Sequence, residues 1–142
     1  NSMFANVRTW IVEWGDCDPA GIVFYPRFFA AFDTSTSRLI EAATGTKKAE
    51  LIREHAIIGW PMVDAGAKFI APATFGDEVQ IETHVARVGR SSFAVEHRLL
   101  KGGKLCIEAT AVRVWAAPRQ DGRPGIEGVP IPREIAAKLR AE

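Results

Sequence analysis

The spacing of apolar and polar residues along the chain changes twice, and each change predicts a different kind of element. Residues 7–13 alternate loosely, which indicates a strand with both faces partly covered. From Pro26 to Thr44 the apolar residues recur at helical spacing, and Gly45 is the expected end of a long helix. Because residues 28–32 are consecutive apolar residues, we expect the first half of this helix to be buried on nearly all sides.

A short second helix is predicted at Lys47–His55, and beyond Pro61 the pattern becomes the two-residue alternation of strands. Gly102 and Gly103 form a good two-residue hairpin turn, and a loop after the last strand leads to a tail helix at 132–142. The four expected strands lie at residues 62–72, 77–89, 91–101 and 104–117.

One strand, a long helix and then a run of strands predict an α+β fold with an antiparallel sheet. A single long helix covers only part of one face of such a sheet. The remaining apolar strand surface therefore predicts self-association.

Composition narrows the class of protein. The 142 residues fit one domain, 1–142, and 47% hydrophobic with 25% charged residues is usual for a globular protein. A formal charge of +1 argues against a protein that binds nucleic acid or anionic membranes through bulk charge. Asn1 and Ser2 before Met3 are interpreted as a cloning remnant, and no signal peptide or membrane-spanning run is recognised.

The two cysteines, Cys17 and Cys106, form no metal-binding spacing. We interpret them as reduced thiols of a cytoplasmic protein, with a lone disulfide as the alternative. The histidines His55, His84 and His97 share no motif with an acid or a serine, and we expect each to be a surface residue on a strand.

Chemistry concentrates in the stretch WGDCDPAGIVFYPRFF, which runs from Trp14 to Phe29. An aspartate before Pro and Gly often caps a turn, and this is the expected role of Asp16. Asp18 lies a few residues before the N-terminus of the long helix, where free N–H groups and the helix dipole favour an oxyanion. A carboxylate beside such donors suits attack on an acyl carbonyl, as a nucleophile or as the base that activates water.

This stretch resembles the hot-dog-fold acyl-CoA thioesterases, and most of all the 4-hydroxybenzoyl-CoA thioesterase branch, whose motif is close to GDCDPAGIVWYPNY. The similarity continues in IETHVARVGRSSF and EATAVRVWA. The resemblance implies a long central helix wrapped by a five-stranded antiparallel sheet, and hydrolysis of an aromatic acyl-CoA to the free acid and CoA. It also implies homodimers that pair into tetramers, with each active site shared across a dimer interface.

Carried over by position, the resemblance assigns the catalytic carboxylate to Asp18 and the N–H that polarises the thioester carbonyl to Tyr25. It aligns the acyl pocket with Asp33 and Trp60, so that a ligand hydroxyl would pair with Asp33. The alternative is that Asp33 pairs with a nearby arginine or faces solvent. Trp60 is larger than the residue usual in the family, which leaves the size of the acyl group open.

The family's phosphate-binding turn falls on Arg90, with the hydroxyls of Ser91 and Ser92 beside it, and Arg87 or Lys104 could compensate for the basic residues that are replaced. The alternative for each cation is a solvated surface charge. No metal or redox cofactor is expected, since CoA is part of the substrate. Rival functions are a thioesterase for short or medium aliphatic acyl-CoA, a hot-dog hydratase or dehydratase, and a non-catalytic acyl-CoA binder.

Overall fold

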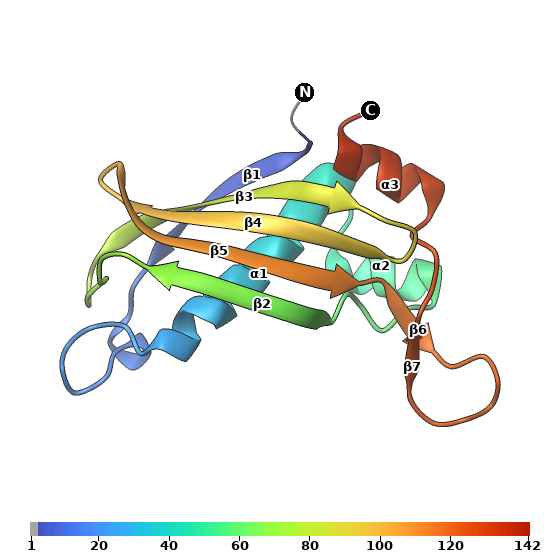
Figure 1. Ribbon diagram of the computed structural model, residues 1–142, viewed down its shortest axis with the longest axis horizontal. Coiled ribbons are helices and arrows are strands. Elements are labelled where there is room, and N and C mark those ends of the chain that lie inside the picture. The colour runs from blue at the N-terminus through green and yellow to red at the C-terminus, as the bar shows by residue number, and fades with distance from the viewer. Residues whose placement is uncertain (1–2) are drawn as a thin grey trace.

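A computed structural model describes residues 3–142 and shows an antiparallel sheet curved around one side of a long helix (Figure 1). Asn1 and Ser2, interpreted above as a cloning remnant, lie outside the described residues. The elements in chain order are β1 (Ala5–Ile11), the 3-10 turn η1 (Trp14–Asp16), α1 (Tyr25–Thr44), α2 (Lys48–His55), β2 (Met62–Phe69), β3 (Glu78–Val88), β4 (Ser92–Lys101), β5 (Lys104–Val114), β6 (Ala116–Pro118), β7 (Ile126–Gly128) and α3 (Arg133–Arg140).

The main sheet has five strands in the order β1-β3-β4-β5-β2, and every neighbouring pair is antiparallel. This arrangement, with α1 lying across one face of the sheet, confirms the predicted α+β hot-dog fold. The short hairpin of β6 and β7 was not predicted: Ala116 and Ala117 of β6 were assigned to the end of the strand expected at 104–117, and β7 was not expected as a strand. Each of its strands has only three residues, which is too short for alternation to be visible in the sequence.

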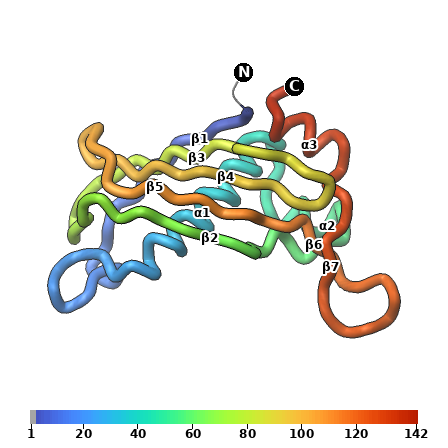
Figure 2. Tube along the Cα trace, in the orientation of Figure 1, coloured from blue at the N-terminus to red at the C-terminus, as the bar shows by residue number. Residues whose placement is uncertain are grey.

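The long helix α1 begins and ends where its sequence predicts. Pro26 stands in the first turn, where its missing N–H costs nothing, and Gly45 adopts φ 69° beyond the last turn while its N–H donates to the Glu41 carbonyl at 2.8 Å. The expectation of burial on nearly all sides is wrong for the first half. Tyr25 is 60% exposed and Ala30 is exposed, because the sheet covers only one side of the helix (Figure 2).

Two apolar clusters hold α1 against the sheet. One lies under its N-terminal half and includes Phe28 and Phe32, which pack with Ile81 and Leu99. The other lies under its C-terminal half, where α2 and α3 add Leu51 and other apolar side chains. The first cluster is the one that fixes the position of the N-terminus of α1.

The edge strand β2 leaves apolar side chains uncovered. All of its residues except Ala67 are exposed, and the large ones are Met62 at 50%, Val63 at 62% and Phe69 at 51%. The sequence predicted uncovered apolar strand surface, and in a single chain it lies at this edge and on the other edge strand β1, where Val7 and Ile11 are exposed. Among the described residues, no helix is long and apolar enough to span a membrane.

Candidate active site

A tight turn before α1 positions Asp18. The Asp18 N–H donates to the Ile22 carbonyl and the Phe24 N–H to the Asp16 carbonyl, both at 2.9 Å, so two short segments pair like the arms of a hairpin. The Gly21 N–H closes the turn onto the Asp18 carbonyl at 2.9 Å, with φ 83° at Gly21. The turn therefore brings Asp18 back beside the residues that lead directly into α1.

The Asp18 carboxylate is half-buried and only partly occupied. Its Oδ1 accepts a hydrogen bond from the Ala20 N–H at 2.8 Å, as in an Asx-turn. Its Oδ2 has no hydrogen-bond partner within residues 3–142. The turn thus holds the carboxylate in place and leaves one oxygen available for chemistry.

Asp16 has the capping role expected from the sequence. Its Oδ2 accepts the Glu13 N–H at 2.9 Å and so stabilises the start of η1. Between the two acids, Cys17 is a free thiol, as is Cys106. Desolvation, followed by the charges of Asp16 and Asp18, raises the pKa of the Cys17 thiol, which argues against a thiolate nucleophile here.

The N-terminus of α1 offers a free donor. Phe24 stands at the N-cap position and supplies no side-chain cap. The Arg27 N–H donates to the Phe24 carbonyl at 2.8 Å, whereas the Tyr25 N–H donates to no acceptor in the described part of the chain. Because Pro26 has no N–H, the Tyr25 N–H is the unshared donor at the positive end of the helix dipole.

An apolar hollow of about 310 Å³ adjoins this donor. It lies between the start of α1 and the end of β2, where the rings of Phe28 and Phe69 are 5.9 Å apart. Asp18 does not line the hollow, but Ile22, which is paired with Asp18 in the turn, does. The lining residues are Ile22, Val23, Tyr25, Phe28, Phe69, Ile70, Ala71, Pro72 and Ala73.

Asp33 has an arginine partner, which is the alternative that the sequence left open. Its side chain is 57% exposed, and its Oδ1 accepts a hydrogen bond from Arg113 Nη1 at 2.6 Å. Arg113 was not among the site residues predicted from the sequence. The available signal was its position on β5, where Arg113 lies on the same face of the strand as the buried residues Ala109 and Ala111.

Trp60 lies in the core. It is 3% exposed and stacks on Trp115 with ring centroids 5.7 Å apart, while its Nε1 donates to Ser37 Oγ at 3.3 Å. Its backbone carbonyl accepts a hydrogen bond from Arg113 at 3.4 Å. The indole is therefore not on the surface of the single chain, and only its carbonyl contacts the Asp33 region.

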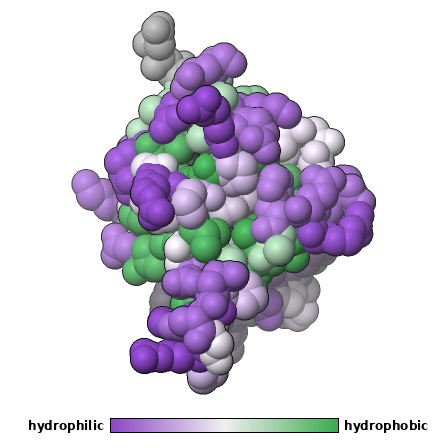
Figure 3. Space-filling view, turned by 90° about the vertical axis from the view of Figure 1, so that its right-hand side faces the viewer, coloured by the Kyte–Doolittle hydropathy of each residue, from purple (hydrophilic) through white to green (hydrophobic). Residues whose placement is uncertain are grey.

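The expected phosphate-binding residues Arg90, Ser91 and Ser92 lie at the opposite end of the sheet from the turn that holds Asp18 (Figure 1). They lie where β3 turns into β4, and the 11 residues of β3 correspond to a length of about 35 Å. Arg90 is exposed, the Ser91 carbonyl accepts the Trp115 N–H at 2.7 Å, and Ser92 Oγ accepts a hydrogen bond from Arg87 at 3.4 Å. Figure 3 shows this end of the molecule, where hydrophilic residues surround a smaller hydrophobic patch.

The expectation of surface histidines on strands holds for His84 alone. His84 is half-buried on β3 and its Nε2 lies 3.3 Å from a carboxylate oxygen of Glu96, whereas His55 ends the helix α2. His97 is only 2% exposed, because it lies on the same face of β4 as the buried residues of that strand. Its Nδ1 lies 2.8 Å from Thr83 Oγ1, and its ring stacks on Phe32 with centroids 4.8 Å apart.

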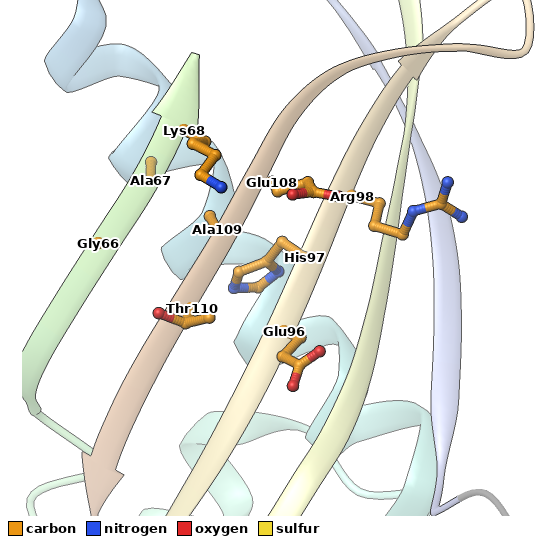
Figure 4. A pocket seen from close by; sticks show the side chains of 9 residues that line it. All are labelled: Gly66, Ala67, Lys68, Glu96, His97, Arg98, Glu108, Ala109 and Thr110. Atoms are coloured by element: carbon orange, nitrogen blue, oxygen red, sulfur yellow. The ribbon is translucent and has the colours of Figure 1, made fainter. Parts of the chain in front are cut away.

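A more spacious hollow, of about 450 Å³, lies on the outer face of the sheet (Figure 4). Side chains of opposite charge alternate there across neighbouring strands, with Glu108 beside Arg98 and Arg98 paired to Glu82 at 3.2 Å. This is the pattern of a solvated face, and Tyr25 does not line it. The described residues contain no cluster of His, Cys, Asp and Glu that could hold a metal ion.

Comparison with known proteins agrees with this geometry. The sequence model of the Thioesterase-like superfamily matches residues 12–139. The chain belongs to this superfamily. It is 33% identical over 110 residues to the 4-hydroxybenzoyl-CoA thioesterase of Pseudomonas sp. (strain CBS-3), a match that covers 74% of this chain and 78% of that protein.

Two solved structures are similar over nearly the whole chain. One is 4-hydroxybenzoyl-CoA thioesterase with an aspartate replaced by asparagine, complexed with 4-hydroxybenzoyl-CoA: TM-score 0.85, 25% identity, 96% of this chain and 99% of that one. The other is a gentisyl-CoA thioesterase, with a TM-score of 0.80 and 31% identity, and the match covers 94% of this chain and 98% of that one. This thioesterase-superfamily member is a thioester hydrolase, an acyl-CoA thioesterase of the hot-dog fold.

Proposed function

We propose that this thioesterase hydrolyses an aromatic acyl-CoA to the free acid and CoA, with the Asp18 carboxylate and the Tyr25 N–H as its catalytic groups. The observation that carries the proposal is the unshared Tyr25 N–H at the N-terminus of α1, beside an apolar hollow and following the turn that holds Asp18. The relatives named for 4-hydroxybenzoyl-CoA and gentisyl-CoA support an aromatic acyl group.

In the proposed reaction the thioester carbonyl oxygen accepts the Tyr25 N–H. As the carbonyl carbon is attacked, negative charge develops on this oxygen, and one such donor is worth about 2.7–4 kcal/mol. The free Oδ2 of Asp18 attacks the carbon to form an anhydride, or removes a proton from an attacking water; in both cases the C–S bond breaks and CoA leaves as its thiolate. On the anhydride route a water molecule then hydrolyses the anhydride, which releases the acid and regenerates the Asp18 carboxylate. Carboxylate, N–H and water suffice, so we propose no metal or redox cofactor.

We further propose that the active site is completed by a second copy of the chain. If two β2 edges pair antiparallel about a two-fold axis, opposite ends of the two copies approach each other. The turn of Arg90, Ser91 and Ser92 from one copy would then serve the CoA phosphates bound at the Asp18 end of the other. Such a dimer, paired further into a tetramer, would also cover Val63 and the other apolar residues of β2.

We also propose that residues 1–142 form one hot-dog domain. The free thiols Cys17 and Cys106 fit a reducing, cytoplasmic compartment.

A hydratase mechanism would need a histidine near Asp18, and none of the three histidines lies in that turn. An aliphatic acyl group is the second candidate, because Ile22, Val23 and Ile70 also line the hollow.

Substitution of Asp18 tests the proposal. With 4-hydroxybenzoyl-CoA as substrate, Asp18→Asn should lower kcat by roughly 10²–10⁴-fold with little change in KM. Asp16→Asn is the matched control: the asparagine oxygen can still accept the Glu13 N–H, so the variant should keep the turn and most of the turnover. Unchanged turnover in Asp18→Asn would contradict the assignment, and preferential cleavage of short aliphatic acyl-CoA by the wild type would favour the second candidate.

A further inference from the structure

A polar hollow of about 210 Å³ lies between the edge strand β1 and the first turns of α1. The hollow beside Tyr25 adjoins β2, which is the opposite edge strand of the sheet, so the two hollows lie on different flanks of the helix. Strand β1 contributes Arg8 and Trp10 to the polar hollow, and α1 contributes Arg27, Thr34 and two alanines. None of these side chains has a part in the proposed hydrolysis.

Arg8 is a half-buried cation without a carboxylate partner. It lies on the more buried face of β1, between the exposed residues Val7 and Thr9. Its Nε donates to Ser35 Oγ at 2.7 Å, and its Nη2 donates to the Ala31 carbonyl at 2.8 Å. Two of the five N–H groups of the guanidinium are thus used, and within residues 3–142 no acid forms an ion pair with it.

The charges around Arg8 are mostly positive. Burial, followed by the charge of Arg38, lowers the pKa of Arg8, even though Arg38 itself pairs with Glu41. Arg27 lines the same hollow and also forms no ion pair in the described chain. The one acid that lines the hollow is Asp16, whose Oδ2 already accepts a backbone N–H.

The hydrogen bonds that Arg8 makes to α1 do not account for its charge. Both acceptors are neutral oxygens, and an uncharged donor could serve them. A cation that is partly removed from water and has no counter-ion is unfavourable for the fold. The charge is therefore better explained by an anion that enters the hollow than by the attachment of β1 to the helix.

We propose that this hollow binds a small oxyanion, a phosphate or a carboxylate, with Arg8 as its main contact. The planar guanidinium matches two oxygens of either group. The bonds to Ser35 and Ala31 hold the guanidinium in place before the anion arrives, so less side-chain freedom is lost on binding. Arg27 adds a second cation, and Thr34 adds a hydroxyl donor.

Calorimetric titration of the full chain with inorganic phosphate tests the proposal. The ionic strength is held constant, because added salt also screens surface charges. The wild type should bind phosphate saturably, and its Tm should rise with phosphate concentration, since the ligand binds the folded state. Arg8→Gln, which keeps a side-chain donor but loses the charge, should weaken binding roughly tenfold or more.

The turn at Arg90 is a second place where phosphate can bind, since the CoA phosphates are proposed to lie there. Arg90→Gln should keep the binding that Arg8→Gln loses, and the reverse result would place the phosphate at that turn and overturn the inference. Arg98→Gln is the control and should bind as the wild type does, because Arg98 pairs with Glu82 on the outer face of the sheet. If Arg8→Gln folds poorly, Arg27→Gln, at an exposed position, replaces it and should also weaken binding.

A parallel titration with acetate distinguishes the two kinds of oxyanion. Saturable binding of phosphate alone, or of acetate alone, identifies the group that the hollow takes, provided that Arg8→Gln weakens it. A wild type that binds neither anion would overturn the inference, as would an Arg8→Gln variant that binds as tightly as the wild type. Both of these results would leave the thioesterase proposal standing, because the site shares no side chain with the proposed catalytic groups.

Discussion

The surroundings of a carboxylate decide its role in this protein. Asp16 accepts a backbone N–H and caps η1, and Asp18 accepts one N–H and keeps a free oxygen beside the start of α1. Asp33 is held by the buried Arg113. Three chemically identical side chains thus differ in role: Asp16 caps a turn, Asp18 has the proposed catalytic role and Asp33 forms an ion pair.

His97 makes stability depend on pH. Burial, followed by the charges of Arg113, His84 and Arg8, lowers its pKa from 6.5 to about 3. Because the folded-state pKa lies below the unfolded value, the stability contributed by neutral His97 is complete above about pH 6.5 and is lost as the pH falls toward 3. The slope approaches about 1.4 kcal/mol per pH unit in that window.

We expect His97→Gln to flatten this dependence. Urea unfolding at pH 7.5 and at pH 5 should show a smaller difference between the two pH values in the variant than in the wild type. The variant will also be less stable at pH 7.5, because the stacking on Phe32 is lost. His55→Gln, at a half-buried position at the end of α2, is the control and should keep the wild-type dependence. Parallel curves for His97→Gln and the wild type would refute this explanation.

At the level of single residues, the sequence predicted what is encoded locally. The turn at Asp18 could be predicted because the acids, Pro19 and Gly21 all lie within one short stretch. Arg113 could not be assigned to Asp33, since 80 residues separate them and only the folded sheet brings them together. The alternation of apolar residues nonetheless indicated that Arg113 and His97 would be buried, because each lies on the apolar face of its strand.

At the level of elements, α1 is bounded by backbone features more than by side-chain caps. Phe24 at the N-cap contributes no side-chain acceptor, and this leaves the first turn open to a ligand. The ends of α1 were predictable because Pro26 and Gly45 mark them. Its burial was overestimated, because an apolar run shows what a segment can bury and not which neighbours cover it.

Gly45→Ala should destabilise the protein by about 1 kcal/mol through the backbone alone. Gly45 has φ 69°, and no atom lies within 4 Å of the position that a Cβ would take, so the effect is conformational and not steric. Gly15→Ala is the matched control, since Gly15 has the same open space and no positive φ. Thermal unfolding should give a lower Tm for the first variant only. Equal Tm values for the two variants would contradict this account.

At the level of the whole molecule, the proposed catalytic and phosphate-binding residues lie at opposite ends of one chain, as Figure 1 shows. In the proposed dimer, pairing of the two β2 edges brings these two ends of different copies together. From its excess of apolar strand surface, the sequence predicts self-association. It could not show that β2 is an edge strand, because strand order depends on pairing between residues far apart in the chain.

Val63→Lys tests this assembly. Val63 is 62% exposed on β2, and a lysine there would place a charge in the proposed interface between the two copies. We therefore expect the dimer dissociation constant to rise at least tenfold and the activity to fall at low protein concentration. Val7→Lys is the matched control, because Val7 is 57% exposed on the opposite edge strand β1. Sedimentation velocity over a concentration series would measure both. Because the proposed site draws residues from two copies, activity should fall in step with the dimer fraction; a fully active Val63→Lys monomer would show that one chain suffices.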